Sequence, residues 1–191
     1  IGLIAEADVK DGDLWLRSRP LTSELIRKTL HLTLLGSDCL GRETIVAGGT
    51  QACDPHCIGS GVLKAHWPIV LDVFPMSLTS RYYADITRTV VKGKPSEKVK
   101  KMYRAVREGQ EIAFGMIRDG ADGQKIHQKI LDHFAQQGFP TGEQDGRMQG
   151  FFHGTGHGLG LEIHEPPRIS PVPDLLKAGQ VVTVEPGLYY L

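Results

Sequence analysis

The 191-residue chain has an ordinary globular composition, with 40% hydrophobic and 23% charged residues. Its 22 basic and 22 acidic residues give a formal net charge of zero, so the usual electrostatic source of nucleic-acid binding is absent. No apolar run approaches the roughly 20 residues that span a bilayer. Composition therefore predicts one globular domain with a single core, and neither nucleic acid nor membrane as a partner.

The chain begins at Ile1 and ends at Leu191 inside an apolar run, so we expect a piece of a longer protein. An odd count of three cysteines argues against a disulfide scaffold and, with no signal-peptide pattern, predicts a cytoplasmic protein. The segment Cys53–Cys57 contains zinc-ligand residue types, but a closed zinc site needs four ligands. Half-buried thiols are the favoured interpretation.

Apolar periodicity and capping residues predict helices that alternate with strands along the chain. The predicted N-caps are Thr22 or Ser23, Ser96 and Asp122, and the predicted helix ends are Gly36, Gly120 and Gly138. The predicted helical segments are the end of a helix within 1–16, then 22–36, 96–120 and 122–138. The predicted β-like segments are 43–47, 68–74, 84–91, 159–163 and 181–190, with 68–74 and 84–91 paired as a hairpin. The glycine-rich stretch 141–150 is expected to be a loop. This order predicts an α+β domain over residues 20–191, preceded by a helical remnant or linker at 1–19.

Asp72 lies in the middle of the apolar strand predicted at 68–74, where burying a carboxylate alone is costly. Asp85 repeats the situation on the following strand. Two carboxylates on paired strands repel each other, so a cation is needed to hold both. That cation is either a metal ion or a basic side chain, for which Arg88 is the candidate.

One glycine-rich segment of twelve residues contains three histidines, His153, His157 and His164. The alternating glycines allow the backbone to approach a ligand or another strand closely. Their spacing differs from that of a dinucleotide-binding loop, and the His-Glu-x-x-His helix of zinc peptidases is absent. The clustering therefore indicates a functional group of imidazoles.

Glu185 ends a further apolar segment, immediately before Pro186. By itself it would be a strand-end carboxylate that faces water. With Asp72, Asp85 and His157 it completes a set of three carboxylates and one imidazole on β-like segments. Such a set suits manganese, cobalt or zinc, and bridging carboxylates suit two ions about 3.5–4 Å apart.

In order and context, these motifs resemble the pita-bread metallopeptidases, the family of methionine aminopeptidase, aminopeptidase P and prolidase. The resemblance runs from about residue 44 to 191 and is carried by Ile45–Gly49, Asp54–His56, Leu71–Pro75, Asp85–Thr89, His153–Glu165 and Thr183–Tyr190. The motifs at 85–89 and 183–190 are closer to aminopeptidase P and prolidase than to methionine aminopeptidase. The resemblance implies the pita-bread (creatinase/aminopeptidase) fold, a curved antiparallel sheet with flanking helices.

The resemblance also implies a centre of two divalent ions, with manganese as the first candidate and cobalt or zinc as alternatives. Asp72 would bind one ion, Asp85 would bridge the pair, and His157 and Glu185 would hold the other. A second Glu that normally bridges both ions has no counterpart after Glu185, so we expect the domain to lack its last strands. The hairpin tip at 76–82 is also longer than the family leads us to expect.

The implied activity is hydrolysis of the peptide bond before proline at peptide N-termini, as an Xaa-Pro aminopeptidase or dipeptidase. His56 and His164 would contact the substrate carbonyl or the leaving nitrogen, and His153 would line the pocket on the proline side. The expected substrate is a peptide with proline at its second position, and a homodimer is an open alternative to a monomer.

Two rival interpretations remain open. A creatinase-like hydrolase of the same fold uses no metal, and the carboxylates Asp72, Asp85 and Glu185 count against it. A non-catalytic or inactive pita-bread module that binds peptides is the alternative function, because the last metal-ligand Glu is absent. Bound metal in the purified protein would favour the peptidase.

Overall fold

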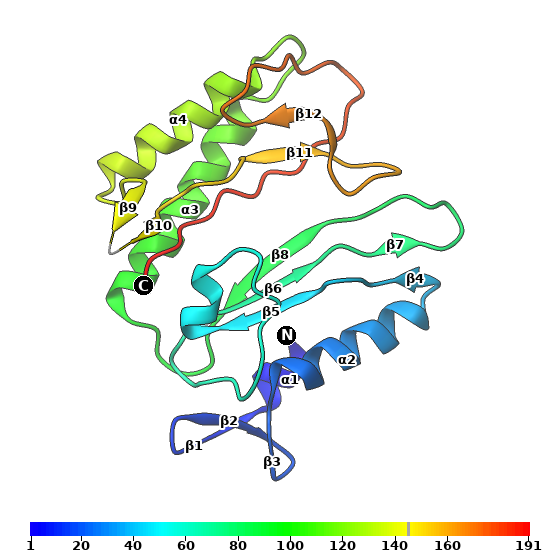
Figure 1. Ribbon diagram of the computed structural model, residues 1–191, viewed down its shortest axis with the longest axis vertical. Coiled ribbons are helices and arrows are strands. Elements are labelled where there is room, and N and C mark those ends of the chain that lie inside the picture. The colour runs from blue at the N-terminus through cyan, green and yellow to red at the C-terminus, as the bar shows by residue number, and fades with distance from the viewer. Residues whose placement is uncertain (145) are drawn as a thin grey trace. The chain divides into compact units, whose positions relative to one another are not determined.

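The computed structural model describes residues 1–144 and 146–191 (Figure 1). The chain divides into two compact units, residues 1–99 and 100–191, and each is described by itself. Within the described residues, no helix is long and apolar enough to cross a membrane.

The centre of the first unit is a three-stranded antiparallel sheet in the order β5-β6-β8. Its strands are Ile45–Gly48, Ile69–Val73 and Ile86–Val90. Ile69 and Leu71 are buried on one face of β6, as the predicted alternation requires. The predicted hairpin pairing is confirmed, with Asp72 opposite Thr87 and Val73 opposite Ile86.

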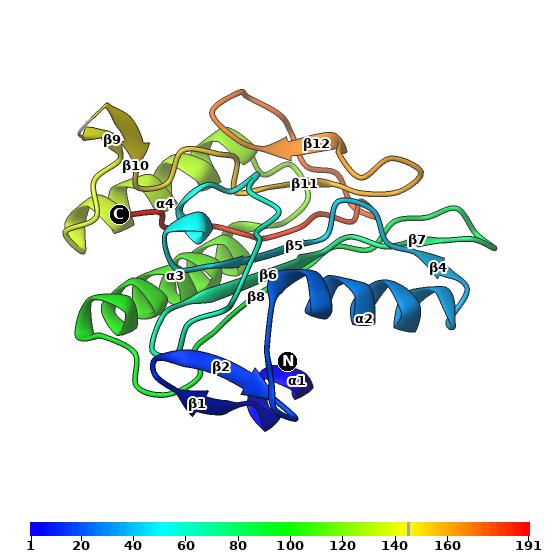
Figure 2. The ribbon, with the colours of Figure 1, turned by 60° about the horizontal axis from the view of Figure 1, so that its bottom comes forward.

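Helix α2, Ser23–Leu35, packs along this sheet (Figure 2). Thr22 caps it by accepting a hydrogen bond from the backbone of Leu25 at 3.2 Å, and Gly36 follows its last turn, as predicted. Ile26 is buried in a core that also contains Leu14, Val46 and Ile69. A 3-10 helix, Gly49–Cys53, leads from β5 into the loop that carries His56.

The helix expected within residues 1–16 is confined to α1, Gly2–Glu6. A small antiparallel sheet follows, made of β1 Asp8–Lys10, β2 Asp13–Leu16 and β3 Arg19–Pro20. Residues 13–16 form a strand and not a helix because Leu14 is fully buried and its amide donates to the carbonyl of Leu63 at 2.9 Å. The long hairpin tip also gains structure, since β7 Met76–Ser77 pairs with β4 Cys39–Leu40.

The second unit contains α4, Gly123–Gln136, and all but the first three residues of α3, Glu97–Met116, and the two helices lie side by side (Figures 1 and 2). Their predicted caps are confirmed, since Ser96 and Asp122 accept from backbone amides of the first turns at 3.2 and 3.0 Å. Helix α3 ends at Met116, four residues before the predicted Gly120. The core between the helices is lined by Ala105, Ala113, Ile126, Ile130 and Phe134.

The strands of the second unit differ most from the prediction. The stretch expected to be a loop forms a hairpin of β9 Gly142–Gln144 and β10 Arg147–Gln149, and position 145 lies outside the described residues. The strand expected at 159–163 is replaced by β11 Gly156–Gly158 and β12 Glu165–Ile169, paired antiparallel. In the segment 181–190, isolated antiparallel β-bridges pair Val182 with Gly158 and Tyr189 with Gly150.

Candidate metal centre

In the first unit, Asp72 lies within the β6–β8 ladder and Asp85 immediately precedes β8. Asp72 lies opposite Thr87, and Asp85 precedes Thr87 by two residues, so the alternation of β8, continued by one residue, would direct both side chains to the same side. Residues in this diagonal relation lie about 7–8 Å apart at their Cα atoms, within reach of two carboxylates that share a cation. Both aspartates are half-buried. The first unit therefore contributes two half-buried carboxylates, and their role as metal ligands stays a prediction.

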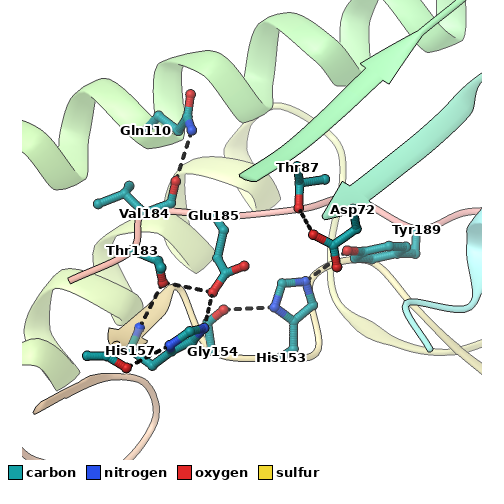
Figure 3. Close-up of polar contacts among 11 residues, drawn as sticks. Asp72, Thr87, Gln110, His153, Gly154, His157, Thr183, Val184, Glu185 and Tyr189 are labelled. Atoms are coloured by element: carbon teal, nitrogen blue, oxygen red, sulfur yellow. Dashed lines mark hydrogen bonds and ion pairs between the residues drawn. The ribbon is translucent and has the colours of Figure 1, made fainter. Parts of the chain in front are cut away.

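Asp72 accepts a hydrogen bond from the hydroxyl of Thr87, with 2.6 Å between Oγ1 and Oδ1 (Figure 3). Arg88, the candidate salt-bridge partner, lies opposite Leu71 and therefore on the other face of the sheet. Its guanidinium donates to the backbone carbonyl of Thr87 at 2.8 Å. The ladder thus directs the basic side chain away from the aspartate face, which favours a metal ion over Arg88.

In the second unit, His157 and Glu185 face each other directly (Figure 3). Nε2 of His157 lies 2.9 Å from Oε1 of Glu185, and the two side chains are 12% and 30% exposed. Nδ1 of His157 lies 3.0 Å from the carbonyl oxygen of Gly158, which can only accept. Nδ1 therefore carries a hydrogen, and in the neutral ring the lone pair is on Nε2.

Two electron-pair donors, an imidazole nitrogen and a carboxylate oxygen, therefore converge at one point. A proton or a metal cation between them satisfies both. Orientation of a ligating imidazole by a carbonyl bound to its other nitrogen is the usual arrangement in metal sites. The donor set of this unit fits a divalent ion held by one nitrogen and one oxygen.

Close backbone approach explains the glycines on either side of His157. A Cβ on Gly156 would lie 2.0 Å from the carbonyl oxygen of Thr183, and one on Gly158 would lie 2.4 Å from that of Pro166. Strand β11 is therefore tightly enclosed between β12 and the segment that leads to Glu185. The amide of Thr183 donates to the carbonyl of His157 at 2.8 Å, which fixes the register of the two candidate ligands.

Thr183 joins His157 and Glu185 through its hydroxyl (Figure 3). The hydroxyl accepts from the amide of His157 at 3.0 Å and donates to Oε1 of Glu185 at 2.8 Å. Burial raises the pKa of Glu185, but the hydrogen bond and charge of His157, with the Thr183 hydroxyl, outweigh it and leave that pKa below its ordinary value. A proton between the two groups therefore favours the ionised form of Glu185, which is also the form that ligates a metal.

Of the three histidines predicted to contact the substrate, two belong to the second unit. The ring of His164 stands edge-on to that of His157, with centroids 4.4 Å apart, and His164 is exposed. The Nδ1 hydrogen of His153 points to the carbonyl of Gly154 at 2.8 Å, and Nε2 lies 3.0 Å from the hydroxyl of Tyr189. This unit therefore gathers His153, His157, His164 and Glu185, while the roles of the histidines remain predictions.

His56 belongs to the first unit, in an exposed turn after the 3-10 helix. Its amide donates to Oδ1 of Asp54 at 2.9 Å. Arg27 of α2 holds the next part of the loop, donating to the carbonyls of Ile58 and Gly59 at 2.6 and 2.8 Å. In the described part of the chain, no group of three or more potential metal ligands includes a residue of Cys53–Cys57. All three cysteines are half-buried, as expected.

Thr183 and Gln110 were not predicted from the sequence as orienting residues. The side-chain amide of Gln110 donates to the carbonyl of Val184 at 2.9 Å (Figure 3). Gln110 lies in the middle of a helix, where a polar residue usually faces water, so only the fold reveals its partner. For Thr183, a hydroxyl two residues before Glu185 on the same strand face was the available signal.

The chain belongs to metallopeptidase family M24, whose model matches residues 13–191. Membership of a metallopeptidase family implies divalent metal ions, in agreement with the donors of each unit.

Similar proteins support the same family. The chain is 37% identical over 155 residues to the uncharacterized peptidase YqhT of Bacillus subtilis, covering 81% of this chain and 41% of that protein. It is 38% identical over 149 residues to an Xaa-Pro dipeptidase of Pyrococcus furiosus, covering 77% and 40%. The crystal structure of the prolidase from Pyrococcus horikoshii OT3 matches with a TM-score of 0.80 and 29% identity, over 90% of this chain and 48% of that chain. The predicted pita-bread fold is thereby confirmed, and the chain spans about two fifths of the length of these relatives.

Proposed function

We propose that this chain contributes to a metal-dependent peptidase that hydrolyses the peptide bond before proline at peptide N-termini. The observation that carries the proposal is the convergence of His157 Nε2 and Glu185 Oε1 at 2.9 Å, with Nδ1 of the same ring directed to a carbonyl. Such a pair is arranged to bind a cation, and the family to which the chain belongs consists of metallopeptidases. The Xaa-Pro dipeptidase and prolidase among its relatives support proline as the specificity.

The ligands that we propose are Asp72 and Asp85 from the first unit and His157 and Glu185 from the second. Three carboxylates and one imidazole suit manganese, and cobalt or zinc are the alternatives. When bound, divalent ions polarise the scissile carbonyl and activate water at neutral pH. Thr87 and Thr183 orient Asp72 and Glu185 by the hydrogen bonds described above.

The histidines supply proton transfer and orientation in this proposal. His56 and His164 donate to the substrate carbonyl oxygen or to the leaving nitrogen, which stabilises the charge that develops there. His153 lines the pocket on the proline side. Its contacts with Tyr189 and the T-shaped packing of its ring on Phe151, with centroids 5.0 Å apart, support an apolar, fixed surface suited to a proline ring.

Metal content and cleavage, measured on the same preparation, test the proposal. After manganese loading, elemental analysis is combined with hydrolysis of a Gly-Pro dipeptide and of a longer Xaa-Pro peptide. Preference for the dipeptide or the longer peptide separates a dipeptidase from an aminopeptidase. Glu185→Gln should lose both metal and cleavage, while Glu162→Gln, at an exposed position of the same unit, should retain both.

The alternative function is a pita-bread module that binds peptides without cleaving them. It predicts retention of an Xaa-Pro peptide, measured by calorimetry, with no hydrolysis at any manganese concentration. A homodimer and a cytoplasmic location stay predictions as well. Light scattering of the purified chain checks the first, and fractionation of cells that express the protein checks the second.

A further inference from the structure

Helix α4 contains a buried histidine that none of the roles above uses. His127 is 3% exposed and lies among Ile126, Ile130 and Phe134, the apolar residues of the second core. Its ring packs on Phe151 at 5.2 Å between centroids, with the planes tilted by 52°. A buried imidazole is costly unless it is hydrogen-bonded, so its polar partner indicates what it does.

That partner is Thr155, in the middle of the His153–His157 segment. Nδ1 of His127 lies 3.0 Å from Oγ1 of Thr155, and Thr155 has no exposed surface. A helix of the core is thereby joined to the glycine-rich segment by one buried hydrogen bond. Glycines flank Thr155 on both sides, so the backbone here has few side chains of its own to fix its position.

Both backbone groups of Thr155 are also bonded, one on each side. Its amide donates to the carbonyl of Ile169 in β12 at 2.7 Å, and its carbonyl accepts from the amide of Glu185 at 2.8 Å. The position of Thr155 therefore sets where the backbone of Glu185 lies. Two residues further along the same segment, His157 meets the carboxylate of Glu185.

We propose that His127 is a positioning residue, whose hydrogen bond to Thr155 holds the backbone that sets Glu185 against His157. Its consequence for metal affinity rests on the proposed function, but the positioning itself does not. A purely structural role would make His127 stabilise the whole unit equally. A positioning role makes it order the Glu185 segment in particular, and these two roles are separable by experiment.

The test is hydrogen exchange of individual amides in the metal-free protein, followed by NMR. Thr155→Val replaces the hydroxyl with a methyl group and should raise exchange at the Glu185 amide about tenfold, the factor for loss of one buried hydrogen bond. The amide of Gly150, bonded to the carbonyl of Tyr189 at 2.9 Å, serves as the internal reference and should change little. Thr155→Ser retains the hydroxyl and should keep exchange at Glu185 close to that of the unmodified protein.

His127→Leu and His127→Asn repeat the comparison from the other partner. Asn keeps a hydrogen-bonding atom near the position of Nδ1 and should restore slow exchange that Leu loses. Equal acceleration at Glu185 and Gly150, or no acceleration at Glu185, would overturn the proposal. If His127→Leu does not fold, the Thr155 pair decides the matter alone.

Manganese affinity of the same variants supplies the second measurement, by competition with a fluorescent chelator. Thr155→Val should weaken binding about tenfold and Thr155→Ser should not. Equal manganese affinity in both variants, despite faster exchange at Glu185, would overturn the link to the metal centre. An unmodified protein that binds no manganese would contradict the proposed function, while the exchange data would still decide the role of His127.

Discussion

The hydroxyl of Thr183 is acceptor and donor at once, between the amide of His157 and the carboxylate of Glu185. It is part of the reason why the pKa of Glu185 lies below its ordinary value despite burial. At the residue scale, the candidate centre thus depends on side chains that orient its ligands as well as on the ligands themselves.

Thr183→Val should raise the pKa of Glu185, because valine has a similar shape and no hydroxyl. The carboxylate would then lose a hydrogen-bond donor that favours its charged form, so less would oppose the rise in pKa that burial causes. Carboxyl carbon NMR of the metal-free protein against pH measures the change. Thr183→Ser keeps the hydroxyl and should leave the titration unchanged; an equal shift in both variants would contradict this account.

The burial of His127 predicts a pH dependence of stability. Desolvation first, and then the charge of His153, lowers the pKa of His127 from 6.5 to about 4. Between these pH values the unfolded chain binds a proton that the folded chain does not, so stability falls as the pH falls from 6.5 towards 4. The loss attributable to this residue is about 3 kcal/mol in the free energy of unfolding.

Urea unfolding at pH 7 and at pH 4.5 measures that loss. His127→Asn has no titrating group, so the difference between the two pH values should shrink relative to the unmodified protein. The comparison isolates His127 from the other groups that titrate in this range. An undiminished pH dependence in His127→Asn would show that His127 is not the cause.

At the element scale, β11 is enclosed by backbone on both sides, and Gly156 is where the approach is closest. A Cβ there would lie 2.0 Å from the carbonyl oxygen of Thr183, so the strand must shift to accept any side chain. The shift would separate His157 from Glu185, because the same two segments carry them. The glycines of this motif are therefore explained by strand packing.

Gly156→Ala should lower the free energy of unfolding by about 2 kcal/mol, in the range for forced overpacking, and should abolish metal binding. The matched control is Gly154→Ala in the same segment, where the nearest atom is the carbonyl oxygen of Ile169 at 3.4 Å. Chemical unfolding and manganese titration of both variants check the prediction. Equal effects at the two positions would refute the packing explanation.

At the scale of the whole molecule, the proposed ligands come from both units of the chain. Metal that binds the folded state alone stabilises it by about 2.7 kcal/mol when its concentration is 100 times the dissociation constant. We therefore expect manganese to raise the melting temperature of the unmodified protein. If the four ligands form one centre, Asp85→Asn and Glu185→Gln should each lose this stabilisation, as measured by calorimetry.

If only one of the two substitutions abolishes the stabilisation by manganese, the result contradicts a shared centre. If Glu185→Gln abolishes the effect and Asp85→Asn does not, the ion is held by the second unit without Asp85. Glu162→Gln, exposed and distant in sequence from the proposed ligands of the first unit, should melt like the unmodified protein at each manganese concentration.

Local sequence alone determined the helix caps and the central hairpin of this protein. The caps Ser96 and Asp122 and the hairpin of β6 and β8 were predicted correctly, and Thr22 was one of two candidates for the first cap, because capping and strand alternation act over a few residues. The family was indicated by the same kind of information, since its motifs are short and each carries its own chemistry.

Only the tertiary structure decided which segments lie beside β11 and which residues orient the ligands. The strand expected at 159–163 formed instead at Gly156–Gly158 and Glu165–Ile169, where glycines allow the backbones to approach closely. The contacts of Gln110 with Val184, and of His127 with Thr155, join residues 74 and 28 positions apart. Hydrogen bonds between distant segments leave no periodic pattern in the sequence, so their partners become known only when the chain is folded.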